Sequence, residues 1–202
     1  MKRMLPVILA LCAGCVSVPS SRDPGATPRE PSPAEREAAQ AVSESFHKLR
    51  TAFLEGDALG ALTIMSVQGV SDWLFERTRD GDPEWPKSVA ALDAARKVDL
   101  DHWIRSNKDV KPGFSNRRPH VLPESILTSK WLVETWKKIY APEKDNLIAL
   151  AQKMEVGEIW VDLTNASIFV KLGETPARIY SMVMENGQWK FDYRVRPATN
   201  RQ

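Results

Sequence analysis

The dipeptide Asn186-Gly187 constrains the fold more than any other short segment of this 202-residue chain. Between two alternating segments it predicts a type I′ hairpin, because both turn residues must take positive φ. The turn sets the strand register, so that Glu185 faces Gln188 and the side chains alternate between two faces. One face carries Tyr180, Met182, Met184, Trp189, Phe191 and Tyr193, and the other carries Ile179, Ser181, Val183, Lys190, Asp192 and Arg194. We expect the first face to be core and Asp192, on the second, to be solvated.

A change of apolar period at Gly157 predicts that this hairpin belongs to an antiparallel sheet. From there to the hairpin's second strand, apolar residues recur with a period of two in four segments joined by short turns. The segments are 157–164, 167–172, 177–185 and 188–195. The sequence therefore predicts about four strands, with helices covering one side of the sheet.

The part before Gly157 has a helical period. Ser32-Pro33-Ala34-Glu35 is a capping box with proline at the first helical position, and the helix that it opens stops at Gly56. Asp57 can cap a second, shorter helix. We expect further helices at 71–79 and 84–106, with a break near Asp99, a loop at 107–121, and helices at 123–140 and from 142 onward.

The N-terminal 33 residues predict where the protein is located in the cell rather than how it folds. Lys2 and Arg3 precede an apolar run, 4–14, that has the length of a signal-peptide core and is too short to span a bilayer. Small residues then stand directly before Cys15. Residues 15–33 are rich in proline and poor in apolar residues, so we expect an extended, flexible linker. The simplest alternative is an ordinary secretory signal that contains two cysteines.

Residues 1–15 resemble the lipobox of bacterial lipoproteins, with Cys12 at a place where the pattern usually has leucine. The resemblance implies a signal peptide at 1–14, a diacylglycerol and a palmitate-type acyl chain on Cys15, and a membrane anchor in the cell envelope. Val16 follows the cysteine, which by resemblance to enterobacterial sorting implies the outer membrane, facing the periplasm. A chain that begins at Cys15 has no second cysteine, so disulfides and thiol catalysis are not expected.

Charge and motif spacing exclude several classes of function. The formal net charge of +2 comes from Lys2 and Arg3, and removing them leaves 26 basic and 26 acidic residues. A neutral protein is not expected to bind nucleic acid. The three histidines, His47, His102 and His120, show no metal-ligand spacing, so we expect neither metal nor other cofactor. Three basic clusters, 116–120, 137–138 and Arg194 with Arg196 and Arg201, could meet anionic lipid headgroups or cell-wall polymer, or be solvated surface.

Two segments, FHKLRTAFLEGDALGAL (46–62) and MENGQWKFDY (184–193), resemble the nuclear transport factor 2-like superfamily, which includes the SnoaL-like proteins. The resemblance implies a single domain, 34–202, in which a curved sheet (157–196) wraps around the first helix of a helical part (34–155). The resulting cone often has a pocket at its open end. The stretch 67–155 is then an elaboration. The alternative fold is an unrelated α+β two-layer sandwich.

The candidate site follows from that fold. The pocket candidates are Trp160, Asp162, Tyr180 and Tyr193. Asp162 shares a strand face with Trp160, where a carboxylate in a dry cleft could act as a base, with Tyr180 donating a hydrogen bond. Asp162 could equally lie in solvent. We expect a non-catalytic envelope module that binds a small apolar ligand or docks an envelope protein, with a dimer an open alternative. The competing hypothesis is an isomerase- or dehydratase-type enzyme that uses acid–base chemistry.

Overall fold

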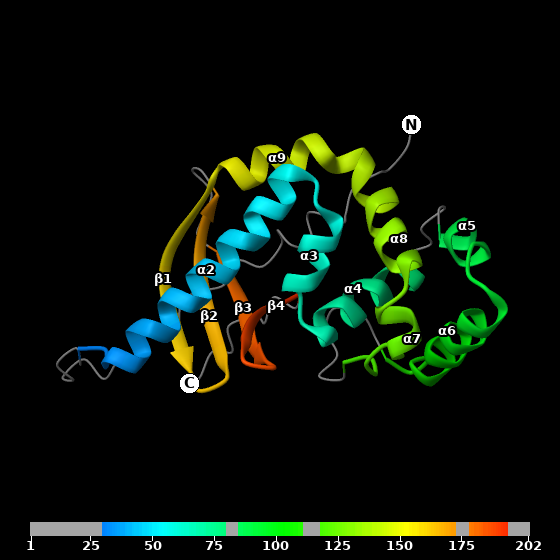
Figure 1. Cartoon of the computed structure of the whole chain (residues 1–202), viewed down its shortest axis with the longest axis horizontal. Helices are drawn as coiled ribbons and strands as arrows, with labels where there is room; N and C mark the ends of the chain where they lie inside the picture. The colour runs from blue at the N-terminus through cyan, green and yellow to red at the C-terminus, as the bar shows by residue number, and fades with distance from the viewer. Residues whose placement is uncertain (1–29, 80–84, 111–117, 173–177, 194–202) are drawn as a thin grey trace.

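A computed structural model describes residues 30–79, 85–110, 118–172 and 178–193, and the helix opened by the capping box crosses its sheet (Figure 1). The Ser32 hydroxyl accepts a hydrogen bond from the Glu35 amide at 3.2 Å, and the Glu35 carboxylate accepts one from the Ser32 amide at 2.6 Å. Helix α2 (Pro33–Glu55) therefore begins where the sequence predicts, and it ends at Gly56, whose φ is 69°. Asp57 caps α3 (Ala58–Ile64), as predicted.

The later helices differ from the prediction at points where short side chains cap new helices. The break predicted at Asp99 is wrong, because Asp93 caps α6 and the interruption lies at 91–93. The predicted helix 123–140 is divided, because Ser129 caps its second part. The helix predicted at 71–79 begins at Val67, since the Ser66 hydroxyl accepts a hydrogen bond from Gly69. The bounds are α4 Val67–Arg79, α5 Trp85–Ala90, α6 Ala94–Ser106, α7 Glu124–Leu127, α8 Lys130–Tyr140, η1 Ala141–Glu143 and α9 Lys144–Gln152.

The four strands form one antiparallel sheet in the order β1-β2-β3-β4. They are β1 Met154–Asp162, β2 Asn165–Leu172, β3 Arg178–Glu185 and β4 Gln188–Asp192. The predicted hairpin register is confirmed from the Glu185–Gln188 pair to the Ser181–Asp192 pair. Strand β1 begins three residues before Gly157, the predicted start of the sheet. A bulge between Val156 and Ile159 interrupts the period of two, so the alternation after Gly157 does not extend back to the first residues of the strand.

The predicted apolar face of the hairpin packs against α2 and forms the core. Figure 1 shows α2 crossing the sheet, and the Ser45 hydroxyl donates to the Trp189 carbonyl at 2.6 Å. The rings of Phe46 and Tyr180 lie 5.8 Å apart. Five residues of the face are buried, and the sixth, Met184, packs against the same core. The expected α+β class, with N-terminal helices on an antiparallel sheet of four strands, is therefore confirmed.

Helices α4 to α8 extend to one side of the sheet and share its core (Figure 1). Trp73 of α4 is fully buried, and its ring lies 4.6 Å from that of Trp136 in α8. The Trp103 indole donates to the His120 carbonyl at 2.6 Å, which fastens the segment before α7 to α6. Tryptophans thus hold these helices together, as their high number suggests. Within the described ranges, every helix is too short or too polar to cross a membrane.

Candidate functional site

A partly enclosed cavity lies between α2, the end of α8, α9 and the concave face of the sheet. Its volume is about 50 Å³, and almost all of the surface around it is carbon. Helix α2 contributes one side through the same stripe that packs on the sheet, and α9 closes the other side. The lining residues are Phe46, Leu49, Arg50, Phe53, Met65, Trp136, Tyr140, Leu147, Leu150, Ala151, Met154, Tyr180, Phe191 and Tyr193.

Few polar groups touch this cavity. Arg50 donates from Nε to the Ala151 carbonyl at 2.6 Å, which holds α9 against α2. Burial raises the pKa of the Tyr140 hydroxyl, and the positive charge of Arg77 offsets part of this rise. Burial also raises the pKa of the Tyr193 hydroxyl well above its ordinary value, and the negative charge of Glu76 adds to the effect. Both tyrosines are therefore neutral hydrogen-bonding groups over the physiological pH range.

A more open groove of about 210 Å³ adjoins the cavity at the end of α2. The two spaces share Phe53, Trp136, Tyr140 and Leu147 in their linings. The rings of Phe53 and Tyr140 lie 6.0 Å apart in this shared wall. Both rings therefore belong to the walls of the cavity and of the groove.

The structure divides the four pocket candidates into two pairs. Tyr180 and Tyr193 line the cavity. Trp160 and Asp162 lie outside it, because the alternation of β1 turns both toward the face of the sheet opposite α2. Asp162 is exposed, and Trp160 packs edge-on against Phe169 with ring centroids 5.0 Å apart and remains 39% exposed. The structure therefore does not bring Asp162 together with Tyr180 as an acid–base pair.

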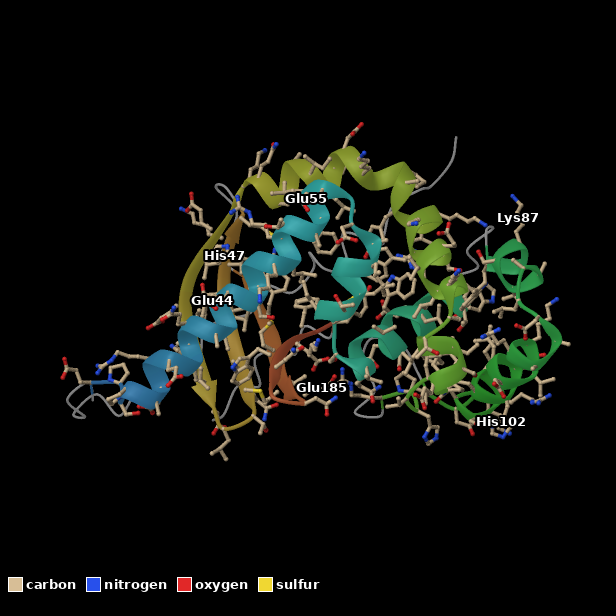
Figure 2. The ribbon with its side chains drawn as sticks, in the orientation of Figure 1. Glu44, His47, Glu55, Lys87, His102 and Glu185 are labelled. Carbon is tan, nitrogen blue, oxygen red and sulfur yellow. The ribbon has the colours of Figure 1, made fainter. Side chains whose placement is uncertain are left out.

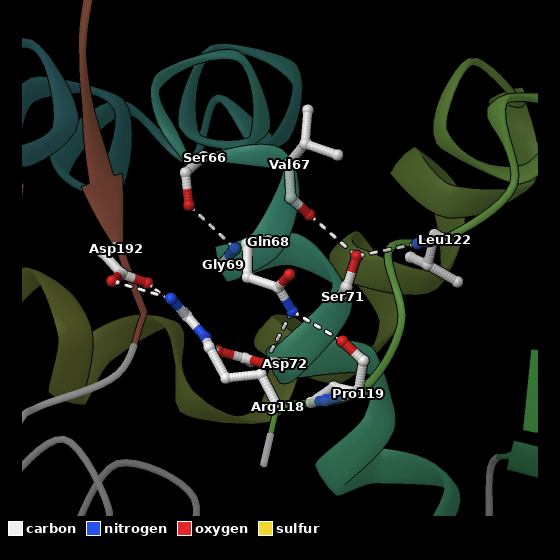
Figure 3. Close-up of polar contacts among 10 residues, drawn as sticks. All are labelled: Ser66, Val67, Gln68, Gly69, Ser71, Asp72, Arg118, Pro119, Leu122 and Asp192. Carbon is white, nitrogen blue, oxygen red and sulfur yellow. Dashed lines mark hydrogen bonds and ion pairs between the residues drawn. The ribbon is translucent and has the colours of Figure 1, made fainter. Parts of the chain in front are cut away.

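The prediction that Asp192 is solvated is wrong. It lies on the predicted face of the hairpin, but it is 1% exposed rather than solvated. Arg118 binds it and also donates to Asp72 of α4, from Nε at 3.0 Å and from an Nη at 2.5 Å (Figure 3). The Gln68 amide donates to both Asp72 and the Pro119 carbonyl. The segment from Arg118 thus covers this edge of the sheet and buries the carboxylate.

The charge on Arg118 is stabilised within this cluster. Burial opposes the charge, but hydrogen bonds to Asp192 and Asp72 outweigh it and hold the pKa of the guanidinium above its ordinary value. The interpretation of 116–120 as solvated surface is therefore wrong for Arg118. Asn116 and Arg117 lie outside the described residues, as do Arg194, Arg196 and Arg201. Lys137 and Lys138, on α8, are exposed.

The described residues contain no cluster of three or more histidine, cysteine, aspartate or glutamate side chains that could hold a metal ion. Figure 2 shows His47 on α2 and His102 on α6 at opposite sides of the molecule. His120 accepts through its backbone carbonyl from Trp103. Cys15 and the rest of the predicted signal peptide and linker up to residue 29 lie outside the described residues.

Sequence reasoning missed the helical half of the cavity. Phe53 stands in the helix predicted to end at Gly56, and Trp136 and Tyr140 stand in the helix predicted at 123–140, where apolar residues recur with helical spacing and form stripes. These stripes predict buried faces, but they do not show that the two faces meet around an incompletely filled space. The cavity is seen only when the packing of the helices in the folded chain is known.

Comparison with known proteins found no matching family model, no similar curated protein and no similar solved structure.

Proposed function

We propose that the domain binds a small apolar molecule in the cavity between α2, α9 and the sheet. The observation that carries this proposal is a partly enclosed space whose lining is almost entirely carbon. A well-packed core leaves few voids larger than a water molecule, and an apolar cavity gains free energy when an apolar group fills it. Tyr140 and Tyr193, both neutral, are among the lining residues, and their hydroxyls are groups that could orient such a molecule.

The proposed role is binding without catalysis. The lining of the cavity contains no carboxylate, imidazole or thiol, as far as the described residues extend. The acid–base alternative rests on Asp162, which lies on the exposed face of β1. The docking alternative needs an unpartnered apolar surface, and the described surface offers single exposed side chains such as Leu163 and Val98.

The cellular setting proposed for this module is a lipid anchor in the cell envelope, at the outer membrane and facing the periplasm. The order of positive, apolar and small residues before Cys15 supports it. The finer fold proposal is a SnoaL-like cone, supported by α2 lying across the sheet and by a cavity lined from both. The helices between 67 and 155 complete that cavity through Trp136, Tyr140 and α9.

Binding can be tested with 1-hexanol, a neutral probe with a narrow apolar chain. Titration of the full chain, followed by two-dimensional NMR, should shift signals of cavity residues such as Tyr180 and Leu150. Ala151→Leu fills the cavity and should abolish these shifts. Ala149→Leu makes the same change at an exposed position of the same helix and should leave binding intact. Absence of binding in the unchanged chain, or equal binding by both variants, would refute the proposal.

The anchor can be tested separately in cells. Cys15→Ser should move the protein out of the membrane fraction and prevent its labelling by an alkyne fatty acid. Cys12→Ser is the matched control and should leave both unchanged. Labelling that persists in Cys15→Ser and disappears in Cys12→Ser would place the lipid on the wrong cysteine and overturn the assignment.

A further inference from the structure

Helix α9 forms a wall of the cavity without belonging to the main core. Leu147, Leu150 and Ala151 line the cavity from this helix. Leu147 and Ala151 are its buried residues, yet both lie outside the cluster of buried residues that joins α2, α4, α8 and the sheet. Leu150 packs against that cluster but is only partly buried. Side chains that line a space lose the contacts they would make in a filled core, so α9 is held less firmly than the helices of the cluster.

Arg50 of α2 supplies a polar attachment for α9. Its Nε donates to the Ala151 carbonyl at 2.6 Å, and its Nη2 donates to the Gln152 carbonyl at 3.3 Å. The last four carbonyls of a helix have no partner within that helix, and the negative end of the helix dipole attracts a cation. The guanidinium therefore caps the end of α9 from a helix far away in the sequence. Both hydrogen bonds form only when α9 lies against α2, so they stabilise the closed position of α9.

The place of α9 in the fold leaves its outer side uncovered. Figure 1 shows α9 along the rim of the molecule, between the end of α8 and the start of β1. The 3-10 segment η1, which contains Pro142, precedes it, and the turn residue Lys153 follows it. A few residues at the ends of an element can absorb the backbone rotation when that element moves as a unit. The exposed residues of α9 are Lys144, Asp145, Asn146, Ala149 and Gln152.

We propose that α9 is a lid over the cavity and that Arg50 is its latch. This inference rests on the proposed function, since the lid controls access of the same apolar ligand to the same cavity. Leu147 lines both the cavity and the adjoining groove, and Lys144 lines the groove. An outward movement of α9 breaks the hydrogen bonds of Arg50 and withdraws side chains from both walls, whereas α2 and the sheet keep their common core. The ligand enters under the raised helix, and the latch then closes it in.

Amide hydrogen exchange of the full chain, followed by two-dimensional NMR, tests whether α9 opens. In the free protein, the amides of Leu150 and Ala151 should exchange at least about a hundredfold faster than those of Phe46 and Leu49 in α2, because opening a lid does not require unfolding of the core. Adding 1-hexanol at ten times its dissociation constant should slow exchange in α9 by about tenfold, since a ligand that binds only the closed form stabilises that form by mass action.

Variants of Arg50 test the latch. Arg50→Met removes both hydrogen bonds and should speed amide exchange in α9 at least about tenfold. The association and dissociation rate constants of 1-hexanol, measured by NMR relaxation dispersion, should both rise at least about fivefold. Loss of a contact with the ligand would raise the dissociation rate constant alone. Arg50→Lys keeps a cation that can donate to one carbonyl, so its rate constants should lie between those of the two forms. Lys48→Met is the matched control, because it replaces an exposed cation on the same helix and should change none of these rates.

The outcomes separate the lid from the proposed function. If 1-hexanol does not bind to the unchanged chain, the proposed function falls and the lid falls with it. If 1-hexanol binds but α9 exchanges no faster than α2, or if the ligand slows exchange equally in both helices, only the lid falls. The latch is overturned if Arg50→Met raises the dissociation rate constant alone, or if Lys48→Met has the same effect as Arg50→Met.

Discussion

Replacing Arg118 with alanine should destabilise the fold more than any other single loss of charge in the described chain. The substitution removes the guanidinium that two buried carboxylates share, those of Asp72 at 3% exposure and Asp192 at 1%. Breaking a buried ion pair from one side costs about 3–5 kcal/mol. The Arg118 side chain is 27% exposed, so water can partly replace it, and we expect the lower end, about 3 kcal/mol. Urea denaturation followed by tryptophan fluorescence measures this free energy of unfolding.

Lys137→Ala is the matched control, because Lys137 also pairs with a carboxylate, that of Glu134, at 2.9 Å. Both of these side chains are more than half exposed. An exposed pair of this kind contributes little, so the control should lower the free energy of unfolding by no more than about 0.5 kcal/mol. Comparing the two variants separates the effect of burying an ion pair on the free energy of unfolding from the effect of its contact geometry.

A rescue experiment tests the reason for the loss. In the Arg118→Ala background, Asp72→Asn together with Asp192→Asn removes the two carboxylate charges that Arg118 had bound and should recover more than half of the lost stability. Charge burial would be refuted as the cause if Arg118→Ala cost no more than Lys137→Ala, or if the two asparagines recovered nothing.

Three further predictions concern the turn, the first helix and the tyrosines. Gly187→Ala should cost about 1–2 kcal/mol in urea unfolding, because Gly187 has a φ of 74°, and an equal stability would contradict the turn type. Ser32→Ala should cost about 1 kcal/mol through loss of the cap, and Ser32→Asp, which keeps it, should cost almost nothing. Burial raises the folded-state pKa of Tyr140 and Tyr193, so their contribution to stability is complete below the unfolded pKa of about 10 and is lost as pH rises toward the folded pKa. Tyr140→Phe should reduce this alkaline loss in unfolding curves at about pH 9–11, and an unchanged slope would argue against a buried hydroxyl.

The hairpin and the first two helices were predictable because their signals are local. The backbone at Asn186 and Gly187 has the positive φ that a type I′ turn needs, and the pairing of the flanking residues follows from the turn alone. The capping box at Ser32 likewise acts within one helical turn. Such signals do not depend on what the rest of the chain does.

The errors share a physical cause, since each depends on a contact between distant residues or on a competing cap. Asp192 lies on the hairpin face opposite Trp189 and Phe191, which predicts a solvated carboxylate, whereas Arg118, 74 residues away in the sequence, covers it. The break expected at Asp99 lies instead where Asp93 caps α6. The cavity depends on how α2, α8 and α9 meet, and no periodicity encodes the space left between them.

The bulge in β1 has a consequence for self-association. Strand β1 is an outer strand that, within the described chain, pairs with β2 alone, and an unpaired strand edge is a template for another copy. Gly157 and Glu158 interrupt the ladder in its middle, and Glu155 and Glu158 are exposed and negatively charged. An edge that is both bent and charged resists pairing in register with an identical edge. This strand therefore disfavours a continuous sheet formed through the β1 edges of two molecules.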